Sequence, residues 1–140
     1  MAELGLAASA IGIVSLAIQV GENIVKLKEF YEAVREAPEE IKYLIEEIET
    51  LALVLREITA TGGNDDGVAG STSMQRCLDL GRKGTDILGS TVRDLEGLLG
   101  RRRRLGAIKI VLKRGLIDKL RDRLRSAQIL LMLSIQAFSE

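Results

Sequence analysis

Histidine and tryptophan are absent from this 140-residue chain, and cysteine and proline each occur only once. Without histidine there is no imidazole to act as a base or to bind a metal. One cysteine cannot supply the roughly four ligands of a zinc site or form an intramolecular disulfide, so nothing requires an oxidising compartment. These absences exclude the commonest catalytic and metal sites, and the sequence predicts no enzyme, no metal and no cofactor.

Aromatic residues make up only 3% of the chain, whereas 46% of its residues are hydrophobic. The core must therefore consist of leucine, isoleucine, valine and alanine. The period-two clusters of aromatic and β-branched residues that mark strands are missing, which favours helices. A chain of this length forms one domain with a core of its own. We therefore expect residues 1–140 to form a single all-α domain, a bundle of four to five helices.

Apolar residues recur at spacings of three and four along most of the chain, as on the buried face of a helix. Gly21 is a place for a bend in the first helix, Ser73 a candidate N-cap and Gly100 a natural stop. The composition of residues 61–73 predicts a flexible loop. We expect helices over residues 3–35, 38–60, 73–100, 107–113 and 116–138.

The same spacings predict the core. The last helix is apolar almost all round over residues 129–135, which is typical of a central, buried element. The candidate core residues are Val20, Ile24, Leu27, Tyr31, Val34, Ile41, Leu44, Ile45, Ile48, Leu51, Leu55, Ile58, Met74, Cys77, Leu78, Gly81, Leu88, Thr91, Val92, Leu95, Leu98, Leu116, Ile117, Leu120 and Leu124.

Three short patterns that could suggest chemistry have simpler explanations. Cys77 lies on an apolar stripe, and we expect a buried, inert thiol. Residues 64–67 (NDDG) lack the alternating ligands and the closing glutamate of a calcium loop. Residues 81–85 (GRKGT) fail the spacing of a phosphate-binding loop and fall inside a helical pattern.

Residues 4–20 carry no charge. Their 17 residues would form a helix of roughly 25 Å, slightly short of the hydrocarbon core, which is about 30 Å thick. Two interpretations stay open: a core helix of a soluble bundle, or a helix that enters a membrane. Both interpretations apply if the helix is buried in the resting bundle and is released on activation.

The net charge is zero, but the charges are segregated. Residues 1–60 carry −6, whereas residues 101–125 carry eleven basic and two acidic side chains, a basic segment of +9. This segment could pair with the acidic second helix, bind anionic lipid, or bind nucleic acid or direct nuclear import. The scarcity of aromatics argues against stacking on single strands, and we expect no nucleic-acid partner.

The N-terminal run LGLAASAIGIVSLAIQV resembles the start of the HeLo-like (HELL) domains of fungal NOD-like receptors and related STAND proteins, as does the run AIKIVLKRGLIDKLRDRLRSAQILLMLSIQ at residues 107–136. The resemblance spans most of the chain. It departs from the family pattern where Ile110 or Val111 replaces an aromatic residue. It implies a HeLo-like bundle that acts as a programmed-cell-death effector in the cytoplasm, moves to the plasma membrane on activation, and permeabilises it after oligomerisation.

By position, the resemblance assigns membrane insertion to the N-terminal helix, with Leu4, Leu6, Ile11, Gly12, Ile13, Val14, Leu16 and Ile18 as candidate residues. The basic segment adds candidate contacts with anionic lipid at Arg101, Arg102, Arg103, Arg104, Lys109, Lys113 and Arg114. Self-association is expected on activation, and a resting dimer through the N-terminal helix stays open. The alternative function is a soluble adaptor that binds another protein through its helices.

Overall fold

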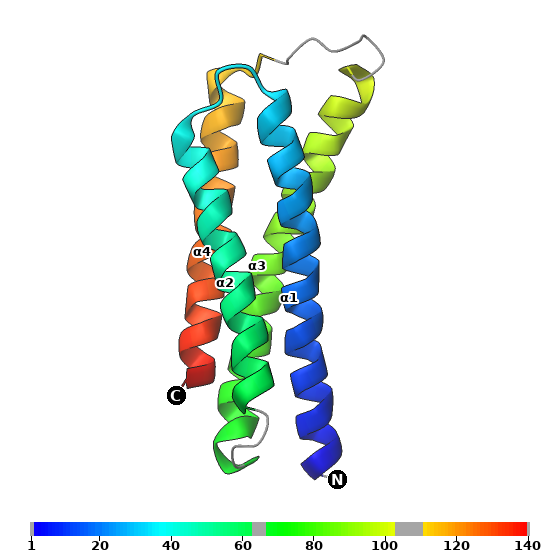
Figure 1. The fold of residues 1–140 in the computed structure, drawn as a ribbon, viewed down its shortest axis with the longest axis vertical. Coiled ribbons are helices and arrows are strands. Elements are labelled where there is room, and N and C mark those ends of the chain that lie inside the picture. The colour runs from blue at the N-terminus through cyan, green and yellow to red at the C-terminus, as the bar shows by residue number, and fades with distance from the viewer. Residues whose placement is uncertain (1, 63–66, 103–110, 140) are drawn as a thin grey trace.

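The computed structural model describes the backbone of residues 2–62, 67–102 and 111–139, and the side chains of residues 11–58, 72–98 and 111–138. Within these ranges the chain forms four helices and no strand (Figure 1). The helices are α1 (Ala2–Ala33), α2 (Glu39–Gly62), α3 (Gly67–Arg102) and α4 (Arg114–Ser139). The predicted all-α fold is confirmed, with four helices among the described residues.

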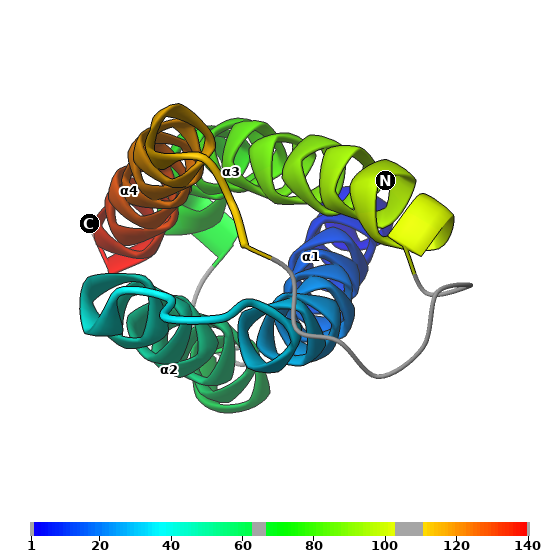
Figure 2. The same cartoon turned by 90° about the horizontal axis from the view of Figure 1, so that it is seen from above.

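The helices stand at the four corners of a bundle (Figure 2). Helix α1 packs against α2 and α3, and α4 packs against the same two helices. Consequently α1 and α4 lie on diagonal corners, as do α2 and α3. The direction of the chain alternates from one helix to the next, so that the N-terminal end of α1 and the C-terminal end of α4 share one end of the bundle (Figure 1).

A tight turn joins α1 to α2 at the other end of the bundle. Glu36 has a φ of 57°, the left-handed conformation that commonly ends a helix. The Tyr31 hydroxyl donates a hydrogen bond to the carbonyl of Ala37 over 3.4 Å. Pro38 follows and α2 begins with Glu39 and Glu40, whose charges suit the N-terminus of a helix.

The core is aliphatic, as predicted, and all four helices contribute to it. The candidate core residues on α1 and α2 are buried or partly buried, and Phe30 joins them although the sequence analysis did not include it. Leu112, just before α4, packs near Phe30, Val34 and Ile41 and helps to close the end of the bundle that holds the α1–α2 turn.

Several predicted boundaries are wrong. Helix α2 extends to Gly62 and α3 begins at Gly67, so most of the expected loop is helical, and residues 63–66 lie outside the described part of the chain. Ser73 is therefore inside α3 and is not its N-cap. Helix α3 also continues past Gly100 to Arg102. Extending an existing helix adds one hydrogen bond for each residue fixed, so it needs no favourable side chain at each step.

Helix α1 runs without interruption through Gly21. One further expectation about the helices differs from the structure. The short helix expected over residues 107–113 is absent at residues 111–113, and residues 107–110 lie outside the described part.

Some side chains that we expected inside the bundle are exposed. They are Leu98 on α3 and, on α4, Leu116, Ile129, Met132 and Leu133. The second half of α4 is therefore not a central element. Since α4 occupies one corner of the bundle, it contacts two other helices in the described part of the chain and keeps one side in water.

Candidate functional site

Helix α1 has an apolar inner face and an apolar outer face. Ile13 and Val20 are fully buried and Leu16 and Ala17 are nearly so, whereas Ile11 is 69% exposed and Ile18 is 48% exposed. The exposed large hydrophobic residues of α1 lie three, four or seven positions apart, so they form one line on its surface. We call this line the α1 stripe; it consists of Ile11, Val14, Ile18 and Val25.

The residues predicted to enter a membrane therefore separate into groups. Ile11, Val14 and Ile18 face outward on the α1 stripe, whereas Ile13 and Leu16 belong to the core. Gly12 lies against the Leu78 side chain of α3. Leu4 and Leu6 lie on α1, in the part whose side chains are outside the described residues.

Small residues let α1 and α4 approach α3 closely. A Cβ atom added at Gly81 would lie 2.8 Å from Leu16 Cδ1 on α1, and one added at Gly84 would lie 3.1 Å from Leu131 Cγ on α4. Both distances are shorter than ordinary contacts between carbon atoms. Gly81 and Gly84 therefore set the spacing on both sides of α3.

The one buried polar pair between helices joins α3 to α4 in the described part of the core. The Ser134 hydroxyl donates to the carbonyl of Cys77 over 2.6 Å and lies 3.2 Å from the Cys77 sulfur. Burial raises the pKa of the Cys77 thiol, which disfavours the reactive thiolate. The predicted burial of Cys77 is confirmed, and its position gives it a packing role.

Part of the basic segment forms ion pairs with other helices of the bundle. Arg121 and Arg125 of α4 both pair with Glu40 of α2, and Arg123 pairs with Asp94 of α3 over 2.6 Å. Two arginines of the basic segment thus pair with the acidic second helix. This was one of the three interpretations that the sequence left open.

The predicted lipid contacts are only partly described. Lys113 and Arg114 are exposed and form no ion pair with another described residue. Arg101 and Arg102 lie in the last turn of α3, and their side chains are outside the described residues. Arg103, Arg104 and Lys109 lie outside the described residues altogether.

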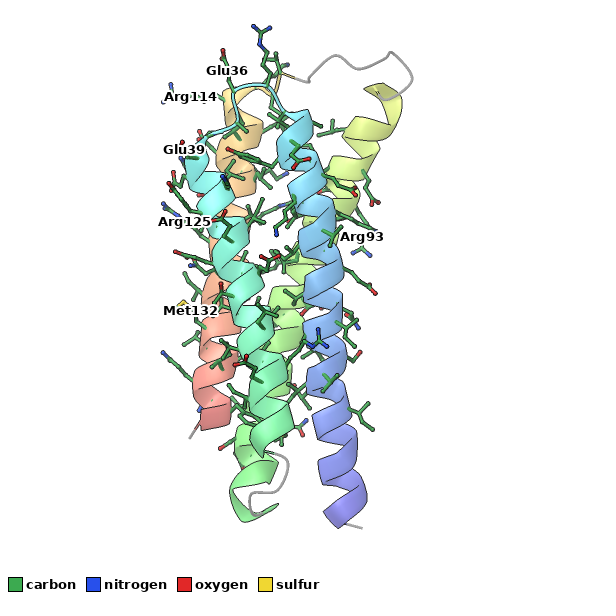
Figure 3. All side chains as sticks on the ribbon, in the orientation of Figure 1. Glu36, Glu39, Arg93, Arg114, Arg125 and Met132 are labelled. Carbon is green, nitrogen blue, oxygen red and sulfur yellow. The ribbon has the colours of Figure 1, made fainter. Side chains whose placement is uncertain are left out.

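The described residues of the two candidate features do not lie together. Arg114 lies at the end of the bundle that holds the α1–α2 turn, whereas the N-terminus lies at the opposite end (Figures 1 and 3). In addition, the α1 stripe and the basic residues of α4 belong to diagonal corners. A flat membrane that contacts the α1 stripe of this bundle therefore lies on the far side from α4.

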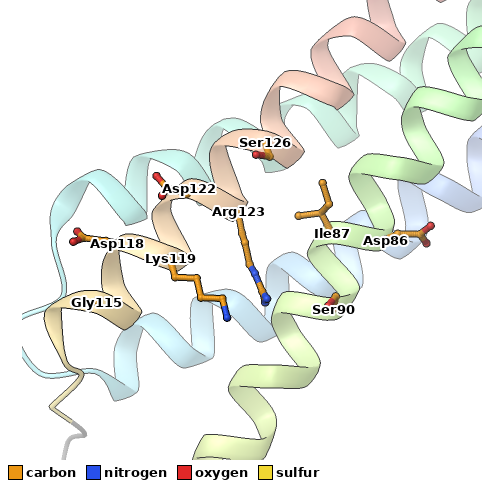
Figure 4. A pocket seen from close by; sticks show the side chains of 9 residues that line it. All are labelled: Asp86, Ile87, Ser90, Gly115, Asp118, Lys119, Asp122, Arg123 and Ser126. Atoms are coloured by element: carbon orange, nitrogen blue, oxygen red, sulfur yellow. The ribbon is translucent and has the colours of Figure 1, made fainter.

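A shallow groove between α3 and α4 has a volume of about 610 Å³ (Figure 4). The carboxylates of Asp86 and Asp122 point away from each other, whereas the side chains of Lys119 and Arg123 extend in the same direction. Among the described residues, no group of histidine, cysteine, aspartate and glutamate could hold a metal ion.

Replacing Arg123 with glutamine should raise the pKa of Asp94. The hydrogen bond from the Arg123 guanidinium holds the pKa of that carboxyl below its ordinary value of 3.8. Because the folded pKa is depressed, this pair contributes stability above the unfolded pKa, and the contribution disappears as the pH falls through the folded pKa. An NMR titration of the Asp94 carboxyl carbon measures the change.

Lys119→Gln is the control for this measurement, because Lys119 acts on Asp94 only through its charge. We expect a smaller upward shift of the Asp94 pKa in this variant. Equal shifts in both variants would mean that the general positive field, and not the hydrogen bond, lowers the pKa.

Two observations complete the description of the surface. No helix, as far as its residues are described, is both long and apolar enough to cross a bilayer. Comparison of the chain with family models, with curated proteins and with solved structures finds no match in any of the three.

Proposed function

We propose that this domain is a membrane-targeting effector that disrupts membranes rich in anionic lipid after it oligomerises, with no catalytic activity of its own. In this proposal it is a HeLo-like executor of programmed cell death in a fungal immune-type receptor, and it moves from the cytoplasm to the plasma membrane when activated. The family assignment rests on the sequence resemblance. The observation that carries the membrane function is the α1 stripe.

The α1 stripe supports contact with lipid because it combines exposed β-branched side chains with an uncharged half-helix. Ile11, Val14 and Ile18 lie within the segment from residue 4 to residue 20, which carries no charge. A helix with such a face can lie in the interface of a membrane with its apolar side buried to a depth of about 5–10 Å. The stripe can make this contact while the inner face of α1 stays in the bundle.

Deeper insertion requires α1 to separate from its neighbours. Ile13 and Leu16 would then leave the core of the bundle and contact lipid. The surfaces of α2 and α3 that they cover would become exposed to water. Burying an aliphatic side chain is worth about 1.5–3 kcal/mol, so this exposure opposes release of α1 from a single copy. Oligomerisation favours release if neighbouring copies cover the vacated surface.

The test is release of a dye from liposomes, with and without anionic lipid, by the self-associated domain. We expect leakage from anionic liposomes by the wild type and its loss in the double variant Ile11→Glu/Ile18→Glu. Deletion of residues 1–20 is a poorer test, because it removes buried side chains such as Ile13 and Val20. Circular dichroism verifies that each variant is folded.

Leu53→Glu is the matched control, since Leu53 is an exposed aliphatic residue on α2, outside the α1 stripe. This variant should release dye like the wild type. Intact anionic liposomes in the presence of folded, self-associated wild-type protein would refute the proposal.

The second candidate function is a soluble adaptor that binds other helical proteins. It is favoured by the exposed apolar residues of α4, Ile129, Met132 and Leu133, which offer a contact surface away from the α1 stripe. A folded domain that neither sediments with liposomes nor releases dye would support this function over the first.

A further inference from the structure

Helix α1 consists of two segments that differ in their compatibility with lipid. The apolar segment, residues 4–20, carries no charge, whereas the charged segment, residues 22–33, carries five charged side chains. These are Glu22, Lys26, Lys28, Glu29 and Glu32. Charged side chains are costly inside the hydrocarbon of a bilayer. The apolar segment can therefore enter lipid, and the charged segment cannot follow it.

The contacts of α1 with the other helices change between the same two segments. In the charged segment, Lys26 pairs with Glu96 of α3 over 3.3 Å and Lys28 pairs with Glu49 of α2 over 2.6 Å. Among the described side chains of residues 11–20, none forms an ion pair or a hydrogen bond with another helix. Apolar packing holds this part of α1 in the bundle, and the acyl chains of lipid can replace apolar contacts.

Gly21 lies between the two segments, on the outer side of α1. It follows Ile18 by three positions and precedes Val25 by four, so it lies on the line of the α1 stripe but has no side chain. A Cβ atom added at Gly21 would meet nothing within 4 Å, whereas one added at Gly81 would lie 2.8 Å from Leu16 Cδ1. Packing therefore requires glycine at Gly81 but not at Gly21.

A glycine that packing does not require makes α1 easier to bend. Glycine in the middle of a helix is less stable than alanine, because it loses more conformational freedom when the helix forms. Helix α1 is continuous through Gly21 in the resting bundle. Because the side chain is missing on the outer side, α1 can bend toward that side without crowding. Such a bend moves the N-terminal end of α1 away from α2 and α3.

We propose that Gly21 is a hinge at which α1 opens, so that the apolar segment swings away from the bundle while the charged segment stays packed on α2 and α3. The opened segment presents Ile13 and Leu16, which are buried at rest, to the membrane that the α1 stripe contacts. This inference rests on the proposed function for its role in the cell. It adds the residue at which the membrane-entering part of α1 ends.

Opening at the hinge leaves a large part of the inner face of α1 in the core. Ile24, Leu27 and Phe30 follow Gly21 and are buried, so they keep their contacts when the apolar segment opens. Exposing apolar surface to water costs free energy roughly in proportion to its area. The partly opened bundle is therefore populated more often than a bundle from which the whole of α1 has separated.

The first test measures opening without lipid, as the rate at which a thiol reagent labels a buried cysteine. Leu16→Cys and Leu27→Cys, each in a Cys77→Ser background, place a single thiol on the inner face of α1 before and after the hinge. Both leucines are buried, so the two substitutions are matched. The Leu16→Cys variant should be labelled faster, because opening at Gly21 exposes that position alone. Equal rates would refute the hinge.

Gly21→Ala, added to the Leu16→Cys variant, tests the hinge residue itself. Alanine favours a helix over glycine by an amount that changes an equilibrium constant about fivefold, so labelling should slow about fivefold. Gly97→Ala is the matched control, because a Cβ atom at either glycine meets nothing within 4 Å. It should leave the labelling rate unchanged, since α3 stays helical when α1 opens. Equal slowing by both substitutions, or no slowing by Gly21→Ala, would contradict the proposal.

The second test locks each segment of α1 in turn before dye release from anionic liposomes is measured, again in a Cys77→Ser background. A disulfide between Leu16→Cys and Gly81→Cys ties the apolar segment to α3, where a Cβ atom at Gly81 lies 4.0 Å from Leu16 Cγ. A short bismaleimide between Lys26→Cys and Glu96→Cys ties the charged segment to α3, where the charged ends of these side chains lie 3.3 Å apart.

Only the first lock should block leakage, and a reducing agent should restore it. The bismaleimide should leave leakage as in the unlocked protein, because the charged segment stays in place during opening. Loss of leakage under both locks would mean that the whole of α1 must separate, and would refute the hinge. A wild type that shows the expected labelling without leakage would refute the membrane function alone, and leakage with equal labelling rates would refute the hinge alone.

Discussion

Replacing Ile13 with glutamate should unfold the bundle, whereas the same substitution at Ile11 should leave it folded. Ile13 has no exposed surface, and Ile11 on the same helix is largely exposed. A buried charge without a partner costs roughly 3–5 kcal/mol, which is a large part of the stability of a domain of this size. At Ile11 the introduced carboxylate stays in water, and we expect a change within about 0.5 kcal/mol.

Urea unfolding followed by circular dichroism measures both effects. The decrease in the free energy of unfolding caused by Ile13→Glu should be smaller at pH 4 than at pH 7. Burial raises the folded-state pKa of the introduced carboxyl above its unfolded value, so the folded state binds more protons and stability falls as the pH rises. Equal destabilisation by the two substitutions would mean that α1 does not have distinct inner and outer faces.

Replacing Gly84 with leucine should destabilise the protein by about 3 kcal/mol. A Cβ atom at this position already lies 3.1 Å from Leu131 Cγ and 3.3 Å from the carbonyl oxygen of Ala127. The larger side chain cannot fit without separating α3 from α4, and that separation would strain the hydrogen bond between Ser134 and Cys77. For a domain of this size we expect the Tm to fall by about 10 °C.

Gly97→Leu is the control, because it makes the same substitution in the same helix at an exposed site. A Cβ atom at Gly97 meets nothing within 4 Å, and leucine favours a helix over glycine by about 0.5–1 kcal/mol. This variant should therefore be slightly more stable than the wild type. A Gly84→Leu protein as stable as Gly97→Leu would mean that α3 and α4 are not in close contact at Gly84.

The predicted residues show where the sequence is informative. On the second half of α1, the apolar residues other than Val25 share one face, so the burial of Val20, Ile24, Leu27 and Val34 follows from spacing. On α4 the same reasoning correctly identified Leu120 and Leu124. It failed at Ile129, Met132 and Leu133, where apolar residues surround the helix and spacing cannot distinguish the buried side from the exposed one.

The sequence left the partners of the basic segment open for a different reason. Glu40 is 81 residues from Arg121 and 85 from Arg125, and nothing in the local pattern relates positions so far apart. Their pairing became evident only when α2 and α4 were found to be neighbours. The contacts of Gly81 and Gly84 with α1 and α4 likewise depend on which helices flank α3.

By itself the sequence determined that this protein is helical, that its core is aliphatic, and that its N-terminal segment is uncharged, because composition and period are local properties of the chain. The tertiary structure decided which side of each helix faces water. Among the described residues each helix contacts two others, so a helix that is apolar all round keeps one apolar side exposed. That is why α1 and α4 each retain an outward apolar surface, at opposite corners.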